Sequence, residues 1–330
     1  MSTIGNLFAR TGLKKPALRV YFFFLNSWKD GVDRSRKMII PRLVRRRSAK
    51  GVYAIELDSD WLGLGARIVK TLEILLYCEE RGLTPLIRYN YREKAKNTDY
   101  FGELFRYTRS VRDLIPGSAF TGIRDNDELG WPEDYNKKLR LKTAKSLFDK
   151  YLTVNPEIIA EVEQFCSDNF RGKKVLGVHY RGTDKAGEAP LVASEQFLQR
   201  IKAVLGERPD LELIFLSTDD EKIIRLLMDS DLPLPVIYRE DAVRSRDGDQ
   251  FHRKREVSKS VVNRDAIINM LILSRCARLL KTASILSDCS VIFNPDIEVT
   301  LINRPHSEGL IWWPCREIIN IQSINEKLCT

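Results

Sequence analysis

Polar and charged side chains follow directly after an apolar run in the second half of the chain. Residues 175–178 (VLGV) are typical of a buried strand, and cations, hydroxyls, a carboxylate and a glycine come next. The candidates for chemistry are therefore His179, Tyr180, Arg181, Gly182, Thr183, Asp184, Lys185 and Glu188. In an α/β sheet, ligands bind where strands end and loops begin. The group predicts an anion site, and an ordinary polar turn between a strand and a helix is the alternative interpretation.

Two further polar groups also follow predicted strands. Residues 217–220 (STDD) come after the strand predicted over 211–216, and residues 282–284 (TAS) come after the strand predicted over 277–281. The carboxyl ends of parallel strands meet at one edge of a sheet. Because of this geometry, we expect all three polar groups to surround a single ligand.

Different residues of the three groups suit different parts of a nucleotide. Arg181 and Lys185 suit phosphate oxygens, and Ser284 at a helix N-terminus adds a hydroxyl and backbone donors. Asp219 and Asp220 are acceptors, suited to ribose hydroxyls or to the N–H edge of a guanine. Together they indicate a nucleotide diphosphate site.

Alternating strands and helices must position these groups. In the second half, strands are predicted at 175–180, 211–216, 235–238 and 277–281, with a helix after each of the first two and another over 263–276. This alternation predicts a parallel sheet that is covered on both faces.

The first half begins with a second unit of the same kind. Residues 52–57 are predicted to form a strand, the Gly63-Leu64-Gly65 loop opens a helix that Gly82 can cap, and residues 83–89 return as a strand. The two loop glycines would let backbone N–H groups approach a ligand, and a tight turn is the alternative. Residues 90–150 are polar and less periodic, so we expect loops and short helices there.

The length of 330 residues fits two α/β domains. We expect a basic arm over 1–50, an N-terminal α/β domain over 51–160 and a C-terminal α/β domain over 161–330 that carries the nucleotide site. The arm holds 13 Lys and Arg against two Asp, although the whole chain has a net charge of +9. Such an arm is a solvated surface segment, a contact with an anionic membrane or, less in keeping with the rest of the sequence, a nucleic-acid contact.

Several classes of protein are disfavoured by what the sequence lacks. No apolar run approaches the length needed to span a bilayer, and the six cysteines show no paired spacing, which favours a reduced, cytoplasmic protein. Three histidines without HxH or HxxxH spacing disfavour a zinc centre. A Walker A motif and a full dinucleotide fingerprint are also missing, which weakens the kinase and dehydrogenase interpretations.

The polar groups resemble the motifs of a known family. Residues 179–185 with Glu188 are similar to the first motif of the α1,6-fucosyltransferases, a family related to the protein O-fucosyltransferases. Residues 217–220 resemble the second motif, residues 263–284 the third, and residues 63–65 the glycine loop. The resemblance implies a GT-B-like α/β fold with two Rossmann-type domains and a nucleotide-sugar cleft between them. In that fold, 51–160 would be the acceptor side and 161–330 would bind the nucleotide sugar. It also implies GDP-fucose as donor, inversion at the anomeric carbon, and no metal or other cofactor.

The resemblance also implies roles for single residues. Arg181 would hold the β-phosphate, His179 would lie near the nucleoside, and Ser284 would bind a phosphate. The guanine-binding acid of the family falls near Asn269, whereas this chain has an Asp at Asp265. The predicted nucleotide-sugar-binding residues are Gly63, Gly65, His179, Arg181, Lys185, Thr218, Asp219, Asp220, Asp265, Asn269 and Ser284.

Glycosyl transfer requires that the charge on the leaving diphosphate is offset and that the incoming hydroxyl loses its proton. We expect Arg181 to do the first and Glu188 the second, with Asp184 as a rival base. The sequence thus predicts a fucosyltransferase that acts on a glycan or a lipid-linked saccharide. The alternatives are a related enzyme with another nucleotide sugar and a binding protein without turnover.

Overall fold

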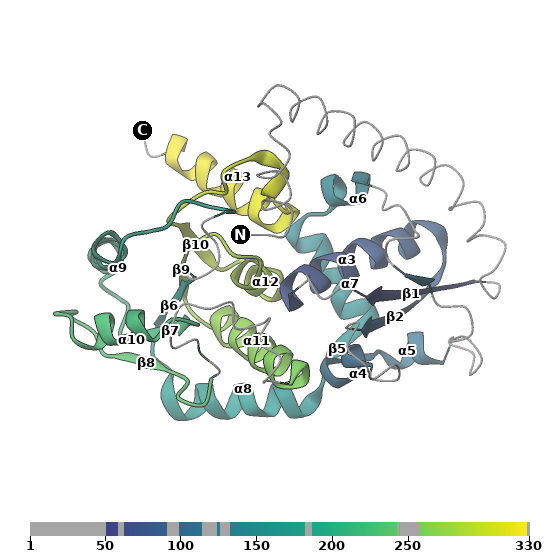
Figure 1. Ribbon diagram of the computed structural model, residues 1–330, viewed down its shortest axis with the longest axis horizontal. Helices are drawn as coiled ribbons and strands as arrows, with labels where there is room; N and C mark the ends of the chain where they lie inside the picture. Colours follow the sequence, from purple (N-terminus) through teal and green to yellow (C-terminus); the bar gives the residue numbers. More distant parts are fainter. Residues whose placement is uncertain are drawn as a thin grey trace, which may run out of the picture.

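The computed structural model describes residues 51–58, 63–90, 99–113, 124–125, 133–181, 187–242, 244 and 258–328. They form an α/β molecule with two separate parallel sheets (Figure 1). The basic arm over 1–50, together with Asp184 and Lys185, lies outside the described residues.

The smaller parallel sheet is built from β1 (Val52–Asp58), β2 (Thr84–Asn90) and β4 (Arg124–Asp125), with β1 in the centre. Helix α3 (Leu64–Arg81) connects β1 to β2 and buries Ile68, Leu72 and Leu75. It ends at Gly82, whose φ of 62° is left-handed and therefore favours glycine. The predicted strand, helix and strand of this unit are confirmed.

The next elements are short. They are α4 (Tyr100–Leu104), β3 (Phe105–Tyr107), α5 (Arg109–Arg112), α6 (Glu133–Lys138), α7 (Leu141–Tyr151) and β5 (Leu152–Val154). Strands β3 and β5 pair antiparallel, a contact that the weak periodicity of this stretch did not predict. Helix α8 (Pro156–Asn169) begins as expected, because the Asn155 side chain accepts a hydrogen bond from the Glu157 amide.

The larger sheet has the order β10-β9-β6-β7-β8, and all its strands are parallel. They are β6 (Val175–Tyr180), β7 (Leu213–Thr218), β8 (Val236–Tyr238), β9 (Arg278–Lys281) and β10 (Glu298–Leu301). The helices of this half are α9 (Ser194–Glu207), α10 (Glu221–Met228), α11 (Lys259–Ser274), α12 (Ile285–Phe293) and α13 (Trp313–Leu328), with a 3-10 turn over Glu308–Leu310. The predicted parallel sheet is confirmed, and β10 is an edge strand that the sequence did not predict.

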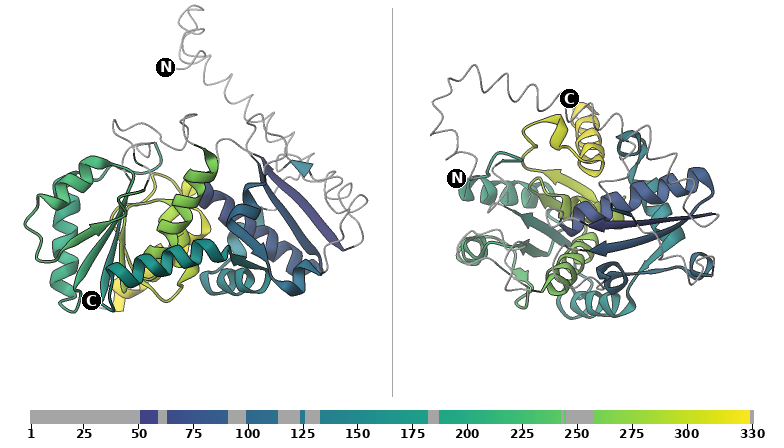
Figure 2. Two further views of the ribbon diagram at one scale, coloured as in Figure 1. Left: turned by 90° about the horizontal axis from the view of Figure 1, so that it is seen from below. Right: turned by 45° about the vertical axis from the view of Figure 1, so that its right-hand side comes forward.

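Side chains alternate between the two faces of this sheet. Val178 and Tyr180 pack with α9 and α10, whereas Phe215 and Leu279 face α8, α11 and α12. Figures 1 and 2 show α11 and α12 between the two sheets. Both faces of the larger sheet are therefore covered, as a buried parallel sheet requires.

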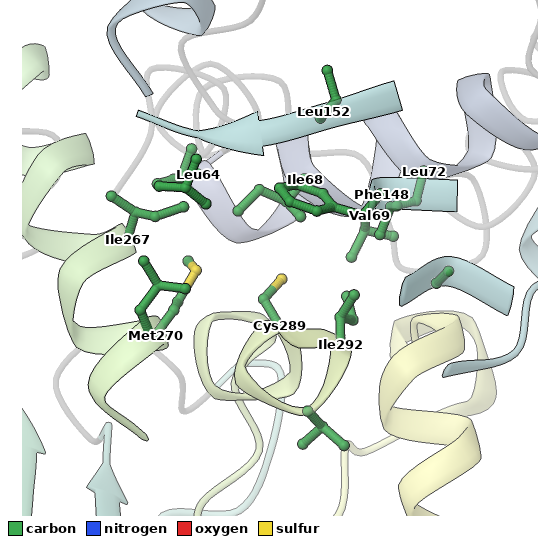
Figure 3. Packing of buried hydrophobic residues seen from close by; sticks show 14 of the residues in the cluster. Leu64, Ile68, Val69, Leu72, Phe148, Leu152, Ile267, Met270, Cys289 and Ile292 are labelled. Carbon is green, nitrogen blue, oxygen red and sulfur yellow. The ribbon is translucent and has the colours of Figure 1, made fainter. Parts of the chain in front are cut away.

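One hydrophobic core joins the two sheets. Figure 3 shows Leu64 and Ile68 of α3 beside Ile267 of α11 and Cys289 of α12. The same buried cluster extends from Ile55 in the smaller sheet to residues of the larger sheet. The division into domains at residue 160 stays a prediction, and the core is continuous across that position.

Within the ranges that the structure describes, no helix combines the length and the apolar composition that crossing a membrane requires.

Candidate functional site

The carboxyl ends of β6, β7 and β9 lie side by side. In the sheet register His179 is opposite Ser217 on one side and Lys281 on the other. The polar groups that follow the three strands therefore share one edge of the larger sheet, as the sequence predicted. This edge is the candidate site.

Arg181 connects all three strand ends. Its guanidinium Nε lies 3.8 Å from Oδ2 of Asp219, which follows β7. Its backbone N–H donates a 3.0 Å hydrogen bond to the hydroxyl of Thr282, which follows β9. The Thr282 amide in turn donates to the carbonyl of His179, also at 3.0 Å. The backbone of Arg181 is thus fixed, and its side chain keeps 18% exposure at the sheet edge.

The two neighbouring aspartates have different surroundings. Asp220 is the N-cap of α10 and accepts a 2.9 Å hydrogen bond from the Lys222 amide. The hydroxyl of Thr218 accepts from the Asp220 amide at 3.1 Å, which closes the turn before the helix. Asp219 contacts Arg181 instead. The spacing of a capping aspartate before a helix could have distinguished the two from sequence.

His179 is a buried imidazole at the centre of the site. It is 3% exposed, and within the described part of the chain its Nδ1 has no hydrogen-bond partner. Burial, together with the positive charges of Lys281 and Arg181, holds the pKa of His179 well below its usual value. The imidazole ring is therefore neutral near pH 7, and its Nδ1 can form a hydrogen bond with a ligand.

Ser284 is the N-cap residue of α12. It is buried, and its side chain makes no capping hydrogen bond. The preceding amide, of Ala283, donates to Oδ1 of Asn303 at 2.7 Å. The first turn of α12 carries the partial positive charge of a helix N-terminus. It adjoins the strand end that holds Thr282.

The first turn of α3 packs against the first turn of α12. A Cβ added to Gly65 would lie 3.0 Å from the backbone carbon of Ile285, and the thiol of Cys289 lies 3.4 Å from the Gly65 carbonyl. Gly65 thus permits the close packing of the two helices. Gly63, the N-cap of α3, is exposed and would have open space around a Cβ. The two predicted glycines therefore have different structural roles.

Glu188 is exposed, and its backbone belongs to a segment that is fixed at three points. The Glu188 carbonyl accepts from the His306 amide at 2.9 Å, and the Pro190 carbonyl accepts from Nδ2 of Asn303 at 2.7 Å. The Tyr180 hydroxyl at the end of β6 donates to the Val192 carbonyl at 2.9 Å. The segment is therefore attached to β6 and to the chain after β10.

Asp265 and Asn269 lie one turn apart on α11 and contact each other, with 3.4 Å between Oδ2 and Nδ2. Asp265 also accepts a 2.6 Å hydrogen bond from Arg239, a buried residue just after β8. Arg239 further contacts Asp241 at 2.7 Å and Glu161 at 3.5 Å. Sequence reasoning missed Arg239, because its carboxylate partners come from three separate segments.

Among the described residues, no group of three or more His, Cys, Asp and Glu side chains is arranged to hold a metal ion.

The chain matches no protein-family model, and no curated protein matches it in sequence. Among solved structures, it is similar to the NodZ α1,6-fucosyltransferase soaked with GDP-fucose, with 15% identity, a TM-score of 0.47, and coverage of 74% of this chain and 94% of that one. It is also similar to Arabidopsis thaliana FUT1, with 10% identity, a TM-score of 0.47, and coverage of 81% and 74%.

POFUT1 in complex with GDP-fucose is a third similar structure, with 11% identity, a TM-score of 0.43, and coverage of 76% of this chain and 97% of that one. These neighbours are fucosyltransferases, which are glycosyltransferases. Their identities to this chain do not exceed 15% and their TM-scores stay below 0.5, so the likeness alone assigns no function to it.

Proposed function

We propose that the chain is an inverting, metal-independent glycosyltransferase that transfers fucose from GDP-fucose to a glycan or a lipid-linked saccharide. The observation that carries the proposal is the placement of Arg181. Its backbone and side chain contact the groups after β7 and β9, and it lies beside the buried His179. The sequence motifs that contain these residues resemble those of the α1,6-fucosyltransferases.

The diphosphate of the donor would bind at Arg181 and at the N-terminus of α12. Arg181 supplies a cation, and Ser284 supplies a hydroxyl at a helix end that favours anions. As the bond to the sugar breaks, negative charge grows on the departing GDP, and Arg181 offsets it. Loss of that contact should cost about 2 to 4 kcal/mol of transition-state stabilisation. Lys185 is proposed as a second phosphate cation.

The nucleoside would lie over the ends of β6 and β7. Asp219 can accept from ribose hydroxyls or from guanine, and the neutral His179 offers Nδ1. Asp220 and Thr218 hold the turn that places Asp219, since the Thr218 hydroxyl accepts from the Asp220 amide and the Asp220 carboxylate accepts from the Lys222 amide. Asp265 and Asn269 are proposed to face the base from α11.

Glu188 is proposed as the base that takes the proton from the acceptor hydroxyl, with Asp184 as the rival. Glu188 has an exposed side chain on a fixed backbone, which suits a group that must meet an incoming acceptor. Because the Arg181 cation and a helix N-terminus offset the phosphate charge, a metal is not required for this chemistry. Cytoplasmic location and contact of residues 1–50 with an anionic membrane are further proposals.

The test is turnover of a panel of nucleotide sugars, with and without a chelator. We expect hydrolysis of or transfer from GDP-fucose that the chelator leaves unchanged, and loss of turnover in Arg181→Ala. Arg225→Ala, which removes an exposed arginine of α10, is the matched control and should keep full activity. Activity that survives Arg181→Ala would contradict the site, and activity that needs a metal would contradict the mechanism.

A second candidate is a glycosyltransferase that uses another nucleotide sugar. The observation that favours it is the contact between Asp265 and Arg239, because a carboxylate engaged at 2.6 Å has less capacity to accept from guanine N–H groups. Calorimetry distinguishes the two candidates. Tighter binding of GDP than of UDP or ADP supports the first, and equal binding of the three supports the second. Binding without turnover would leave a nucleotide-sugar-binding protein.

A further inference from the structure

A fully buried ion pair lies beneath the proposed phosphate site. Nζ of Lys281 is 2.7 Å from Oδ1 of Asp288, and the two side chains are 0% and 2% exposed. Lys281 is the last residue of β9, and Asp288 lies in the first turn of α12. The pair therefore spans the turn between that strand and that helix, residues 282–284.

Two residues of the turn, Thr282 and Ala283, make hydrogen bonds with the candidate site or its supports. Thr282 accepts from the Arg181 amide and donates to the His179 carbonyl. The Ala283 amide donates to Asn303, which also bonds to Pro190 in the segment that carries Glu188. A shift of the turn would therefore move the backbone of Arg181, the N-terminus of α12 and the Glu188 segment together.

The surroundings argue against a simple contribution to stability. Taking two charges out of water is costly, and replacing a buried ion pair by apolar side chains of similar size is often neutral for stability. On the same face of the sheet, Leu279 packs into the apolar core, and a hydrophobic side chain would suit the neighbouring position of Lys281 as well. The two buried charges therefore need an explanation other than stability alone.

We propose that the Lys281–Asp288 pair is a positioning device that holds the β9–α12 turn, and with it Thr282 and Ser284, in register with Arg181 for diphosphate binding. Lys281 and Asp288 act through the turn and need no contact with the ligand. The role in diphosphate binding rests on the proposed function. The role in holding the β9–α12 turn does not depend on the identity of the ligand.

The experiment uses the full-length double variant Lys281→Met/Asp288→Leu, which removes both charges and leaves neither buried alone. Hydrogen exchange by NMR, without ligand, should show at least tenfold faster exchange at the Arg181 and Thr282 amides, with the remaining amides of β6 unchanged. Calorimetry should show at least tenfold weaker GDP binding. The control Lys174→Gln/Asp210→Asn removes an exposed 3.1 Å pair near the opposite ends of β6 and β7, and should change neither quantity.

A second variant covers the case in which the double variant does not fold. Asp288→Glu keeps both charges and moves the carboxylate by one methylene group, so we expect the same changes at a smaller magnitude. Unchanged hydrogen exchange at the Arg181 and Thr282 amides in either folded variant would overturn the inference. A variant with faster exchange at these amides but an unchanged affinity for GDP would overturn it as well. If the unaltered protein does not bind GDP, the proposed donor fails, and the exchange rates alone decide the positioning role.

Discussion

At the scale of single residues, Thr282 joins the backbone of Arg181 to the strand β9. Thr282→Val keeps the shape of the side chain but removes the oxygen that accepts from the Arg181 amide. A buried donor left without a partner costs about 1 to 3 kcal/mol, so we expect a loss of unfolding free energy in that range. Chemical denaturation measures the loss, and turnover should fall in parallel because Arg181 is displaced.

The control for Thr282 is Thr153→Val, which alters an exposed threonine in β5 whose hydroxyl makes only a long 3.5 Å hydrogen bond. It should change the unfolding free energy by less than about 0.5 kcal/mol, as is usual for a surface substitution. A Thr282→Val variant as stable as this control would mean that the hydrogen bond to Arg181 contributes nothing.

His179 gives the protein a specific dependence of stability on pH. Its pKa is lowered in the folded state by burial and by Lys281 and Arg181, whereas in the unfolded chain it stays near the ordinary value of about 6.5. Below that pH the unfolded state binds a proton that the folded state does not, so stability is lost as pH falls from about 6.5 toward the lowered pKa. The slope of unfolding free energy from this group approaches about 1.4 kcal/mol per pH unit.

The measurement is denaturant unfolding between pH 7 and pH 5 for the unaltered protein and for His179→Gln. The difference between their slopes isolates His179, because the carboxylates are common to both proteins. Equal slopes in the two proteins would show that His179 titrates as an ordinary histidine.

At the scale of elements, the contact between α3 and α12 depends on Gly65. A Cβ at this position would lie 3.0 Å from backbone carbon and 3.1 Å from backbone oxygen of Ile285, and backbone atoms cannot turn aside as a flexible side chain can. We expect Gly65→Ala to lower the unfolding free energy by about 1 to 3 kcal/mol, as overpacking does. Thermal and denaturant unfolding would measure it.

Gly63→Ala is the matched control, because Gly63 is the N-cap of the same helix, two residues earlier. A Cβ there meets no atom within 4 Å, so we expect a change smaller than that at Gly65. If both alanine variants have the same stability, then α3 and α12 can separate slightly at no cost, and the packing argument for Gly65 is wrong.

The elements differ in how far the sequence could predict them. The strand over Val175–Tyr180 was predictable from its continuous apolar run, and the helix over Leu64–Arg81 was predictable because its apolar residues recur at the helical period. β3 and β10 were missed because each is only three or four residues long. β3 is stabilised by pairing with β5, which is distant in the sequence, and β10 by pairing with β9, which shows no clear apolar alternation. Arg239 and the Lys281–Asp288 pair were missed for a related reason: a buried charge is recognised only when its partner is known.

At the scale of the whole molecule, the continuous core joins two sheets that the sequence assigned to separate domains. The buried cluster includes Ile55 from β1, Phe148 from α7 and Phe215 from β7. The ring centroids of Phe148 and Phe293 of α12 are 5.2 Å apart, across the predicted boundary. Neither sheet could lose the other without exposing apolar side chains to water.

We therefore expect the protein to unfold in a single cooperative transition. Far-UV circular dichroism reports on both halves. Intrinsic tryptophan fluorescence, from Trp28, Trp61 and Trp131 in the first half and from Trp312 and Trp313 in the second, should follow the same curve as denaturant increases. The fragment 51–160 should remain unfolded when produced alone, because Phe148 and its neighbours would lack the helices that cover them. Two separated transitions, or a folded 51–160 fragment, would instead establish two independent domains able to move against each other during the reaction.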